Sequence, residues 1–569
     1  MKPSMINFSL IPACILMILA AGCTKKLDQY PNYEISTPTY WKTASDATLA
    51  LQGCYANVTN IAYDYWYFDG ASDNCYDQYP WESAATFISS GTFSAGTING
   101  INGANAIGDY SNEYQSIRSC NTFLGNIGGV TMDAATKTQY TGEVRFLRAF
   151  DYFLLAEMFG DVPLIVSSNT AVDTLTPAKE ATVISYVLSQ LDSAANELPS
   201  SPAGGGRASQ GAALALKARV QLFYQQWPDA AATALQVMNS GNYSLFKVKS
   251  LSSTDTLDSY SNLVSFANAT DKQNFYLGLR SYQNMYFFAN EGNPEFIFEC
   301  QFSAAAPYQY TGQSNGLATL LPPSDLNGWS SIDPTQSLVD AYWNRDGSTY
   351  TPVSQAVSAG YYNWPNTPAP AYFNQFKNRD TRLYASVWYT GNPWNAYAPG
   401  YSFAWQGPNN NNSATGYNFR KLLDPAFANN PSWQAAQSFP LIRYAEVLLT
   451  YAEAKNEASG PDASVYAALD SIRSRAGMPF VDPTVYNNQA ALRTLIQNER
   501  RIELAGEGTR YFDIRRWGIA ASVMTTVNDN RNTLAQNRTW LPIFMKLPYP
   551  QAAVDANKDL QAAQSAKGY

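Results

Sequence analysis

Apolar residues recur every three or four positions along several stretches of the chain, which is the pattern of amphipathic helices. Residues 142–159 show the pattern clearly, because Val144, Leu147 and Phe150 share one helix face and Gly160 follows as a stop signal. The same periodicity predicts helices over residues 45–57, 110–125, 142–159, 177–198, 211–224, 228–240, 438–458, 462–476 and 489–506.

Two neighbouring stretches predict a pair of antiparallel helices that approach each other closely. Residues 211–224 and 228–240 carry alanines at helical spacing, Ala212 and Ala215 among them, and small side chains permit close packing. Pro228 follows the corner between them and opens the second helix. The unit is about 30 residues long and resembles a tetratricopeptide repeat. A comparable pair is predicted over residues 438–458 and 462–476.

Two long segments, residues 60–109 and 305–435, have weak periodicity and are rich in Gly, Asn, Ser, Pro and aromatic residues. Only residues 295–302 and 382–389 read as short strands. Loops this long are usually functional or disordered, and abundant aromatic residues argue against disorder. The expected fold is therefore mostly α-helical, with tetratricopeptide-like pairs as a scaffold and long irregular loops with a few short strands on the ligand side.

The first residues predict export. Residues 1–22 hold one basic residue and a short apolar run, which is typical of a secretory signal and too short for a resident transmembrane helix. Residues 19–23 resemble the lipobox of bacterial lipoproteins, in which the chain is cleaved before the cysteine and Cys23 is lipidated. The alternative is an ordinary signal peptide with a chance cysteine.

Composition excludes several kinds of chemistry. Removal of residues 1–22 deletes only Lys2, so the mature charge is 36 − 45 = −9, and we expect no nucleic-acid partner. The chain has no histidine, which excludes Ser-His-Asp and Cys-His catalysis and His-ligated zinc. We therefore expect no metal site and no cofactor. A disulfide between Cys54 and Cys75 stays open, although buried free thiols are favoured for these two and for Cys120 and Cys300.

Six motifs in order along the chain resemble one family. They are LD at 27–28 with YWKT at 40–43, RFLRA at 145–149 with FGDVPL at 159–164, GRA at 206–208, IRYAEV at 442–447, NERRIEL at 498–504 and EGTRYFDIRRWG at 507–518. Together they are similar to the SusD/RagB family of nutrient-binding outer-membrane lipoproteins. One departure is that Thr24, Lys25 and Lys26 follow Cys23, where surface-exported members often carry acidic residues.

The resemblance implies a function and a location. Members bind an oligosaccharide or polysaccharide without cleaving it and deliver it to a SusC-like TonB-dependent transporter. The chain would be anchored to the outer membrane through the lipid on Cys23 and face the cell surface. After the signal peptide it would form one body, with an N-terminal helical part (23–245), a loop-rich ligand-side part (246–435) and a C-terminal helical part (436–569).

The resemblance also places ligand contacts in the segment after the first helix and in a loop region past mid-chain, here residues 64–90 and about 325–405. A flat Trp or Tyr ring can stack on the apolar face of a sugar while polar groups fix its hydroxyls. Trp343 reads as a core residue of a short helix instead. The candidate ligand-binding residues are Asp73, Asn74, Tyr79, Trp81, Trp329, Tyr362, Trp364, Arg382, Trp388 and Trp394.

No catalytic residue is expected. Glu499 and Glu503 lie four residues apart on one helix face, as a pair of acid/base groups could. Five nearby arginines favour a network of ion pairs instead, which also takes in Glu507 and Asp513. Two alternatives stay open: an exported glycoside hydrolase that pairs Asp73 with Asp77 or Glu82, and a protein-binding adaptor that uses its helical repeats.

Overall fold

The computed structural model describes residues 40–97, 110–168, 175–201, 204–303, 314–362, 368–409, 411–428 and 435–569. The predicted lipidation site Cys23 and the candidate Trp364 lie outside these residues. Within them, every helix is too short or too polar to cross a bilayer.

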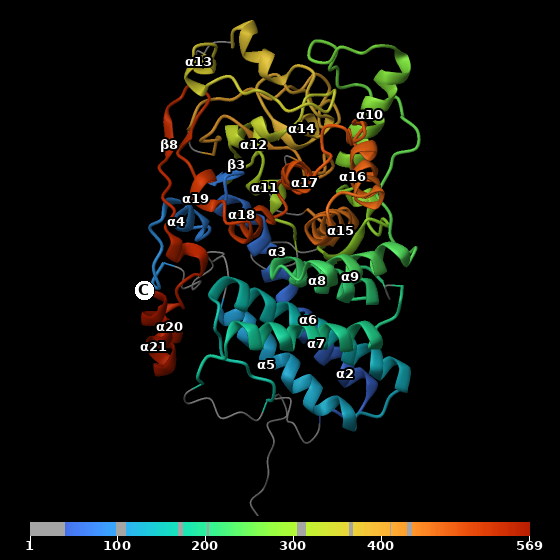
Figure 1. Ribbon diagram of the computed structural model, residues 1–569, viewed down its shortest axis with the longest axis vertical. Coiled ribbons are helices and arrows are strands. Elements are labelled where there is room, and N and C mark those ends of the chain that lie inside the picture. Colours follow the sequence, from blue (N-terminus) through green and yellow to red (C-terminus); the bar gives the residue numbers. More distant parts are fainter. Residues whose placement is uncertain are drawn as a thin grey trace, which may run out of the picture.

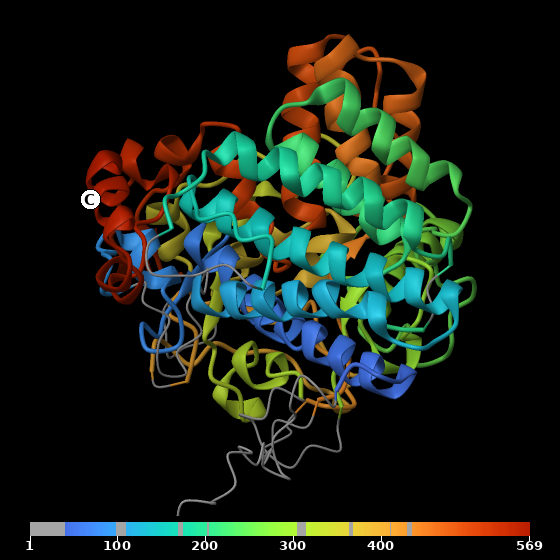
Figure 2. The same cartoon turned by 90° about the horizontal axis from the view of Figure 1, so that it is seen from below.

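The N-terminal half is a stack of helices, and from α5 to α9 each packs against the next one along the chain (Figures 1 and 2). The predicted helices are confirmed, with bounds that mostly shift by a few residues, although α6 begins at Ala134 rather than at residue 142. The predicted loop from residue 60 is wrong at its start, because a further helix, α3, runs on from α2. The elements are α2 (Ala44–Tyr55), α3 (Asn57–Phe68), α5 (Tyr110–Asn126), α6 (Ala134–Phe159), α7 (Glu180–Glu197), α8 (Gln210–Phe223) and α9 (Trp227–Asn239).

The predicted pair of close helices is α8 and α9. The Ser209 side chain accepts a hydrogen bond from the Ala212 backbone N–H and caps α8. Gly211 must be small, since a Cβ at this position would lie 2.4 Å from the Tyr243 ring. Ala212 and Ala215 are buried between the helices, as the alanine spacing predicts. Helix α9 in turn packs against α15 (Tyr444–Ser459), and this contact joins the N-terminal helices to the C-terminal ones.

The C-terminal half contains a second helical pair and the last long helix. The helix predicted from residue 438 is wrong at its start, because Phe439–Arg443 forms strand β6, which pairs antiparallel with β2. All five residues of β6 are buried, so no alternation of polar and apolar positions identifies it as a strand. The elements are β2 (Phe296–Cys300), β6, α15 (Tyr444–Ser459), α16 (Ala463–Arg475), α17 (Gln489–Glu503) and α18 (Arg510–Arg516).

Short elements and irregular chain make up the rest of the described residues (Figure 1). The strand predicted over residues 382–389 is mostly wrong, since Asp380 caps a helical turn by accepting from the Arg382 backbone N–H. These elements are β1 (Cys75–Asp77), α4 (Ala85–Ser90), α10 (Ala269–Asn284), α11 (Leu317–Leu320), β3 (Ile332–Pro334), α12 (Gln336–Ala341), α13 (Gln355–Ala359), α14 (Thr381–Ser386), β4 (Val387–Trp388), β5 (Asn418–Phe419), α19 (Ala520–Val523), β7 (Val527–Asn528), β8 (Leu534–Gln536), α20 (Gln551–Ala556) and α21 (Lys558–Lys567).

One short ladder positions the candidate site. Strands β1 and β3 pair antiparallel, with Cys75 opposite Pro334 and Asp77 opposite Ile332. Because the pairing is antiparallel, the residues after β1 lie at the same end of the ladder as the residues before β3. The ladder thereby joins the segment after α3 to the loop-rich middle of the chain.

Buried ion pairs tie the loop-rich middle to α17. Glu503 bonds Arg382 Nη1 at 3.0 Å and Arg443 Nη1 at 2.9 Å, and it also pairs with Arg475. Glu499 bonds Arg382 Nη1 at 2.7 Å. The structural interpretation of these carboxylates is thus confirmed, although most of their partners come from segments far from α17. We call this group the buried ion cluster: Glu295, Glu499, Glu503, Glu507, Arg382, Lys421, Arg443, Arg473 and Arg475.

The four cysteines that the structure describes are buried free thiols: Cys54, Cys75, Cys120 and Cys300. The open possibility of a Cys54–Cys75 disulfide is therefore wrong.

Candidate functional site

Three loops meet at the end of the ladder where β1 finishes and β3 begins. Gln78 donates from Nε2 to the Trp329 carbonyl oxygen at 3.2 Å and to the Asn412 carbonyl oxygen at 3.3 Å. The Tyr79 hydroxyl accepts from the Asn411 backbone N–H at 3.0 Å. These bonds join segments more than 250 residues apart, so the loops are fixed to one another although they lack regular structure.

Trp81 projects from this junction. Its side chain is 66% exposed, and its ring centroid lies 4.8 Å from that of Tyr79, tilted by 32°. Tyr79 is half-buried, and Trp329 is partly buried against the core. An exposed indole next to a second ring offers an apolar platform with polar loop groups around it.

Trp388 and Trp394 do not belong to the surface. Both are fully buried, with ring centroids 4.9 Å apart, so the expectation that they face a ligand is wrong. They begin a column of rings in which Trp394 stacks on Tyr397 at 5.4 Å and Tyr397 meets Tyr401 at 5.2 Å. The loop uses its tryptophans as part of its own core, together with buried neighbours such as Phe403, whose ring stacks on that of Trp388.

Tyr397 and Tyr401 are partly exposed residues that the sequence interpretation passed over. The Tyr401 hydroxyl donates to Asp325 Oδ2 at 3.1 Å, and Ser324 Oγ donates to Asn412 Oδ1 at 3.0 Å, which brings this loop to the same junction. Their signal was available, since both follow Trp394 in the same aromatic segment. We call the resulting surface the aromatic rim: Tyr79, Trp81, Trp329, Tyr397 and Tyr401.

Two more expected ligand contacts are buried. Tyr362 is 3% exposed, and its hydroxyl lies 3.1 Å from Thr390 Oγ1. Arg382 is fully buried in the ion cluster and cannot donate to a ligand hydroxyl. Both expectations of an exposed ligand contact are therefore wrong. Trp343, expected in the core, is buried and donates from Nε1 to Glu499 Oε2 at 2.9 Å.

Asp73 and Asn74 lie at the other end of the ladder and are also buried. Asp73 bonds Arg510 Nε at 2.8 Å and Arg501 Nη2 at 2.9 Å. Although burial opposes it, the neighbouring guanidiniums lower the pKa of Asp73 to about 2. This end is therefore an ionised, salt-bridged wall and is separate from the aromatic rim.

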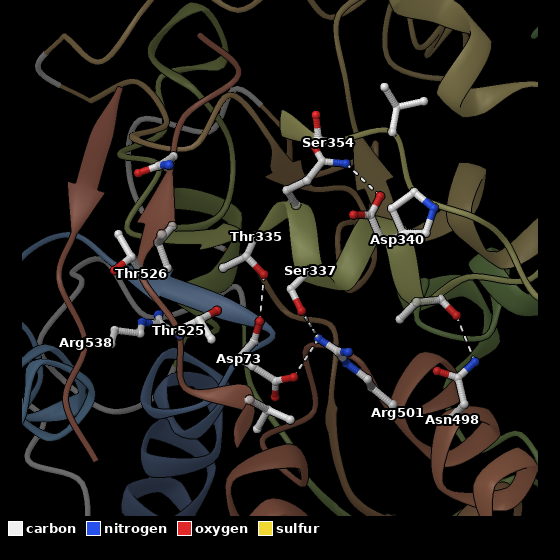
Figure 3. Close-up of a pocket in the computed structure, with 17 residues that line it drawn as sticks. Asp73, Thr335, Ser337, Asp340, Ser354, Asn498, Arg501, Thr525, Thr526 and Arg538 are labelled. Atoms are coloured by element: carbon white, nitrogen blue, oxygen red, sulfur yellow. Dashed lines mark hydrogen bonds and ion pairs between the residues drawn. The ribbon is translucent and has the colours of Figure 1, made fainter. Parts of the chain in front are cut away.

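That wall borders a cavity of about 490 Å³, which we call the polar cavity. Figure 3 shows Asp73, Thr335, Ser337 and Arg501 directed toward one another at its floor. Hydroxyl, amide and charged groups supply most of its lining. The residues that carry these groups are Asp73, Thr335, Gln336, Ser337, Asp340, Ser354, Asn498, Arg501, Thr525, Thr526, Asn528 and Arg538.

The carboxyl groups next to the rim do not form an open catalytic pair. Asp77 is fully buried, and burial, reinforced by Glu82, raises its pKa well above the usual value. Burial raises the pKa of Glu82 to about 7, and Ser331 Oγ donates to its Oε1 at 3.1 Å. Asp73 is held by Arg501 and Arg510 instead. A glycosidase needs two carboxyls that flank an accessible bond, and the pairs formed by Asp73 with these residues do not offer that.

Among the described residues, no group of three or more acidic or cysteine side chains is placed to hold a metal ion.

Comparison with known proteins gives consistent matches. A sequence model described as "SusD family" matches residues 294–569, and one described as "Starch-binding associating with outer membrane" matches residues 41–222. The SusD-like protein P25 of Formosa agariphila is 23% identical, with 96% of this chain and 97% of that protein covered.

Solved structures agree over nearly the whole length. A SusD-like protein of Bacteroides fragilis superposes with a TM-score of 0.74 at 24% identity, covering 93% of this chain and 99% of that one. A SusD-like carbohydrate-binding protein of the same species gives a TM-score of 0.73 at 26% identity, covering 92% and 100%. With both parts matched by SusD models and the tetratricopeptide-like helical fold shared, this chain belongs to the SusD/RagB family.

Proposed function

We propose that this chain is a non-catalytic lipoprotein of the outer membrane that binds a glycan at the aromatic rim. The observation that carries the proposal is Trp81, whose indole is 66% exposed beside Tyr79 on cross-bonded loops. Exposure alone does not single out Trp81, since Phe480 is equally exposed, but the second ring of Tyr79 beside it makes a wider apolar platform. The apolar face of a sugar ring fits such a platform, and loop amides such as Asn411 can meet its hydroxyls.

The proposal includes delivery. Cleavage of residues 1–22 and a lipid on Cys23 would tether the body, and a SusC-like TonB-dependent transporter would receive the ligand. The helical stack would dock on that transporter while the rim faces the glycan. The family description "associating with outer membrane" and the carbohydrate-binding protein of Bacteroides fragilis support this proposal.

Weak binding suits this role. Each aromatic contact contributes about 0.5–1.5 kcal/mol beyond the buried area. Two or three such contacts, with the area they bury, give affinities on the order of millimolar to micromolar. A ligand held this loosely leaves quickly, as transfer to a transporter requires.

Native affinity electrophoresis tests the proposal. Residues 24–569 are run through gels that contain single polysaccharides, neutral and acidic, and the same mixtures are assayed for new reducing ends. We expect at least one glycan to slow the protein, Trp81→Ala to weaken that retardation, and no reducing ends to appear. The matched control is Phe480→Ala, since Phe480 is 67% exposed and lies between α16 and α17. Retardation that Trp81→Ala leaves unchanged, or cleavage at an enzyme-like turnover, would overturn the proposal.

A further inference from the structure

We propose that the polar cavity is a second binding site, for a sugar unit that carries an acidic group, either a carboxylate or a sulfate ester. This inference rests on the proposed glycan-binding function, but it uses residues that take no part in the aromatic rim. The volume of the polar cavity, about 490 Å³, lies within the range of small-molecule sites in proteins.

The cavity and the rim lie at opposite ends of the β1/β3 ladder. Asp73 and Asn74 precede β1 and Thr335 follows β3, whereas Tyr79 and Trp81 follow β1. The Thr335 backbone N–H donates to the Asn74 carbonyl oxygen at 2.9 Å, which fixes the cavity end. At roughly 3.3 Å per residue, strand β1 alone keeps the two ends on the order of 10 Å apart. The two sites are therefore distinct.

Arg501 presents a donor that the protein leaves unused. Its Nε donates to Asn74 Oδ1 at 2.8 Å, and its Nη2 donates to Ser337 Oγ at 2.9 Å and pairs with Asp73. Nη1 has no hydrogen-bond partner among the residues that the structure describes. Figure 3 shows this guanidinium at the cavity wall, so Nη1 is available to a ligand oxygen.

Arg538 is a buried cation whose hydrogen-bond partners are all neutral. It is 9% exposed and donates to Gln536 Oε1 at 2.9 Å and to the carbonyl oxygens of Ser72, at 2.6 Å, and Cys75. Unlike Arg501 and Arg510, it forms no contact ion pair with any described residue, and the charge of Asp73 stabilises it only at longer range. Burying a cation without a contacting counter-charge is unfavourable, and an anionic ligand would offset that penalty. Burial lowers the pKa of Arg538 to about 10, which leaves it charged at neutral pH.

The opposite wall favours a sugar over a bare inorganic anion. Asp340 accepts from Gln336 Nε2 at 2.9 Å through Oδ1, while Oδ2 has no hydrogen-bond partner in the described part of the chain. A carboxylate acceptor next to several threonine and serine hydroxyls can hold the O–H groups of a sugar. A phosphate or sulfate ion would be repelled there. The arginines would bind the anionic group of the ligand, and Asp340 would accept hydrogen bonds from its hydroxyls. A sugar unit with an acidic group carries both.

Titration with small probes tests this inference. Methyl glucuronide, glucose 6-sulfate and neutral methyl glucoside are each added to residues 24–569, and binding is followed by NMR line broadening of the probe. We expect at least one acidic probe to bind ten times more tightly than the neutral one. The response of the two acidic probes distinguishes a carboxylate from a sulfate ester.

A cavity-filling variant locates the site. Thr526 is exposed at the cavity edge, so Thr526→Trp adds bulk to the cavity while both arginines are kept. We expect it to weaken binding of the acidic probe at least tenfold, while the control Thr182→Trp, an exposed threonine on α7, has no effect. Equal binding of all three probes, or no loss in Thr526→Trp, would overturn the inference. Trp81→Ala should leave probe binding unchanged, so failure of the rim proposal is distinguishable from failure of this one.

Discussion

Replacement of Glu503 by glutamine tests the idea that the α17 carboxylates hold the fold together. Glu503 is fully buried and bonds Arg382, Arg443 and Arg475. Glutamine keeps the shape of the side chain but removes the charge that three guanidiniums share. Breaking a buried ion pair from one side costs about 3–5 kcal/mol, so we expect the free energy of unfolding to fall by that amount.

A second Glu→Gln variant, at an ion pair open to solvent, is the matched control. Glu457 pairs with Arg493 at 2.5 Å, but the Arg493 side chain is 38% exposed. Pairs this open to solvent contribute about 0.2–1 kcal/mol, so Glu457→Gln should change the free energy of unfolding by no more than that. Both variants, with the parent, are unfolded in urea at pH 7 and followed by circular dichroism.

The pH dependence of the free energy of unfolding is an independent test of the same ion pairs. Although burial opposes it, Arg475, Arg443 and Arg382 hold the pKa of Glu503 well below its usual value of 4.5. The folded state therefore favours the ionised carboxylate, and the stabilisation is present above the unfolded pKa and lost as the pH falls below it. Glu503→Gln should weaken this acid dependence. The reasoning is refuted if Glu503→Gln lowers stability no more than Glu457→Gln, or if it abolishes glycan retardation in a protein that is still folded.

Three further predictions follow from the rim, the buried acids and the thiols. Trp81→Ala should raise the dissociation constant for the retarded glycan about 2- to 13-fold, as expected for losing about 0.5–1.5 kcal/mol of stacking; calorimetry measures it, and an equal effect of Phe480→Ala would contradict it. Burial raises the pKa of Glu82 from 4.5 to about 7, so the folded state binds more protons than the unfolded one in this window and stability falls as the pH rises through it. Glu82→Gln should make the melting temperature less dependent on pH between pH 5 and 7. An unchanged dependence on pH would contradict the raised pKa of Glu82. Residues 24–569, unfolded without reductant, should show four reactive thiols per chain, and two would indicate a disulfide.

The long helices could be predicted because polar residues interrupt their apolar positions at helical spacing. In residues 142–159 charged residues such as Glu143 and Arg148 stand between the apolar ones, and α6 forms there, although every residue of this stretch except Arg145 is buried. α3 was missed for the opposite reason, since most of its residues, among them Tyr65, Trp66 and Tyr67, are buried and leave no polar stripe. Strand β6 was assigned to a helix for the same reason. Periodicity identifies an element only where polar positions recur along it, whether or not they reach water.

Of the candidate site residues, Trp81 is exposed on the surface, and its contact with a ligand stays a prediction. Composition could not separate Trp394, which is fully buried, from Tyr397 and Tyr401, which cover it. Which ring of an aromatic loop turns inward depends on contacts with segments far away in sequence. The same holds for Arg382, whose partner Glu503 lies 121 residues further on.

The buried ion cluster constrains the order in which the chain can reach its final state. Arg382, Arg443 and Arg475 are synthesised well before Glu503, which arrives near the C-terminus. Until then Arg382 has only Asp380 as a partner among the described residues, and Arg443 and Arg475 share Glu295, so the cations outnumber their counter-ions there. The middle of the chain therefore reaches its full set of ion pairs only when α17 is present. Contacts of such long sequence separation are typical of slow folding.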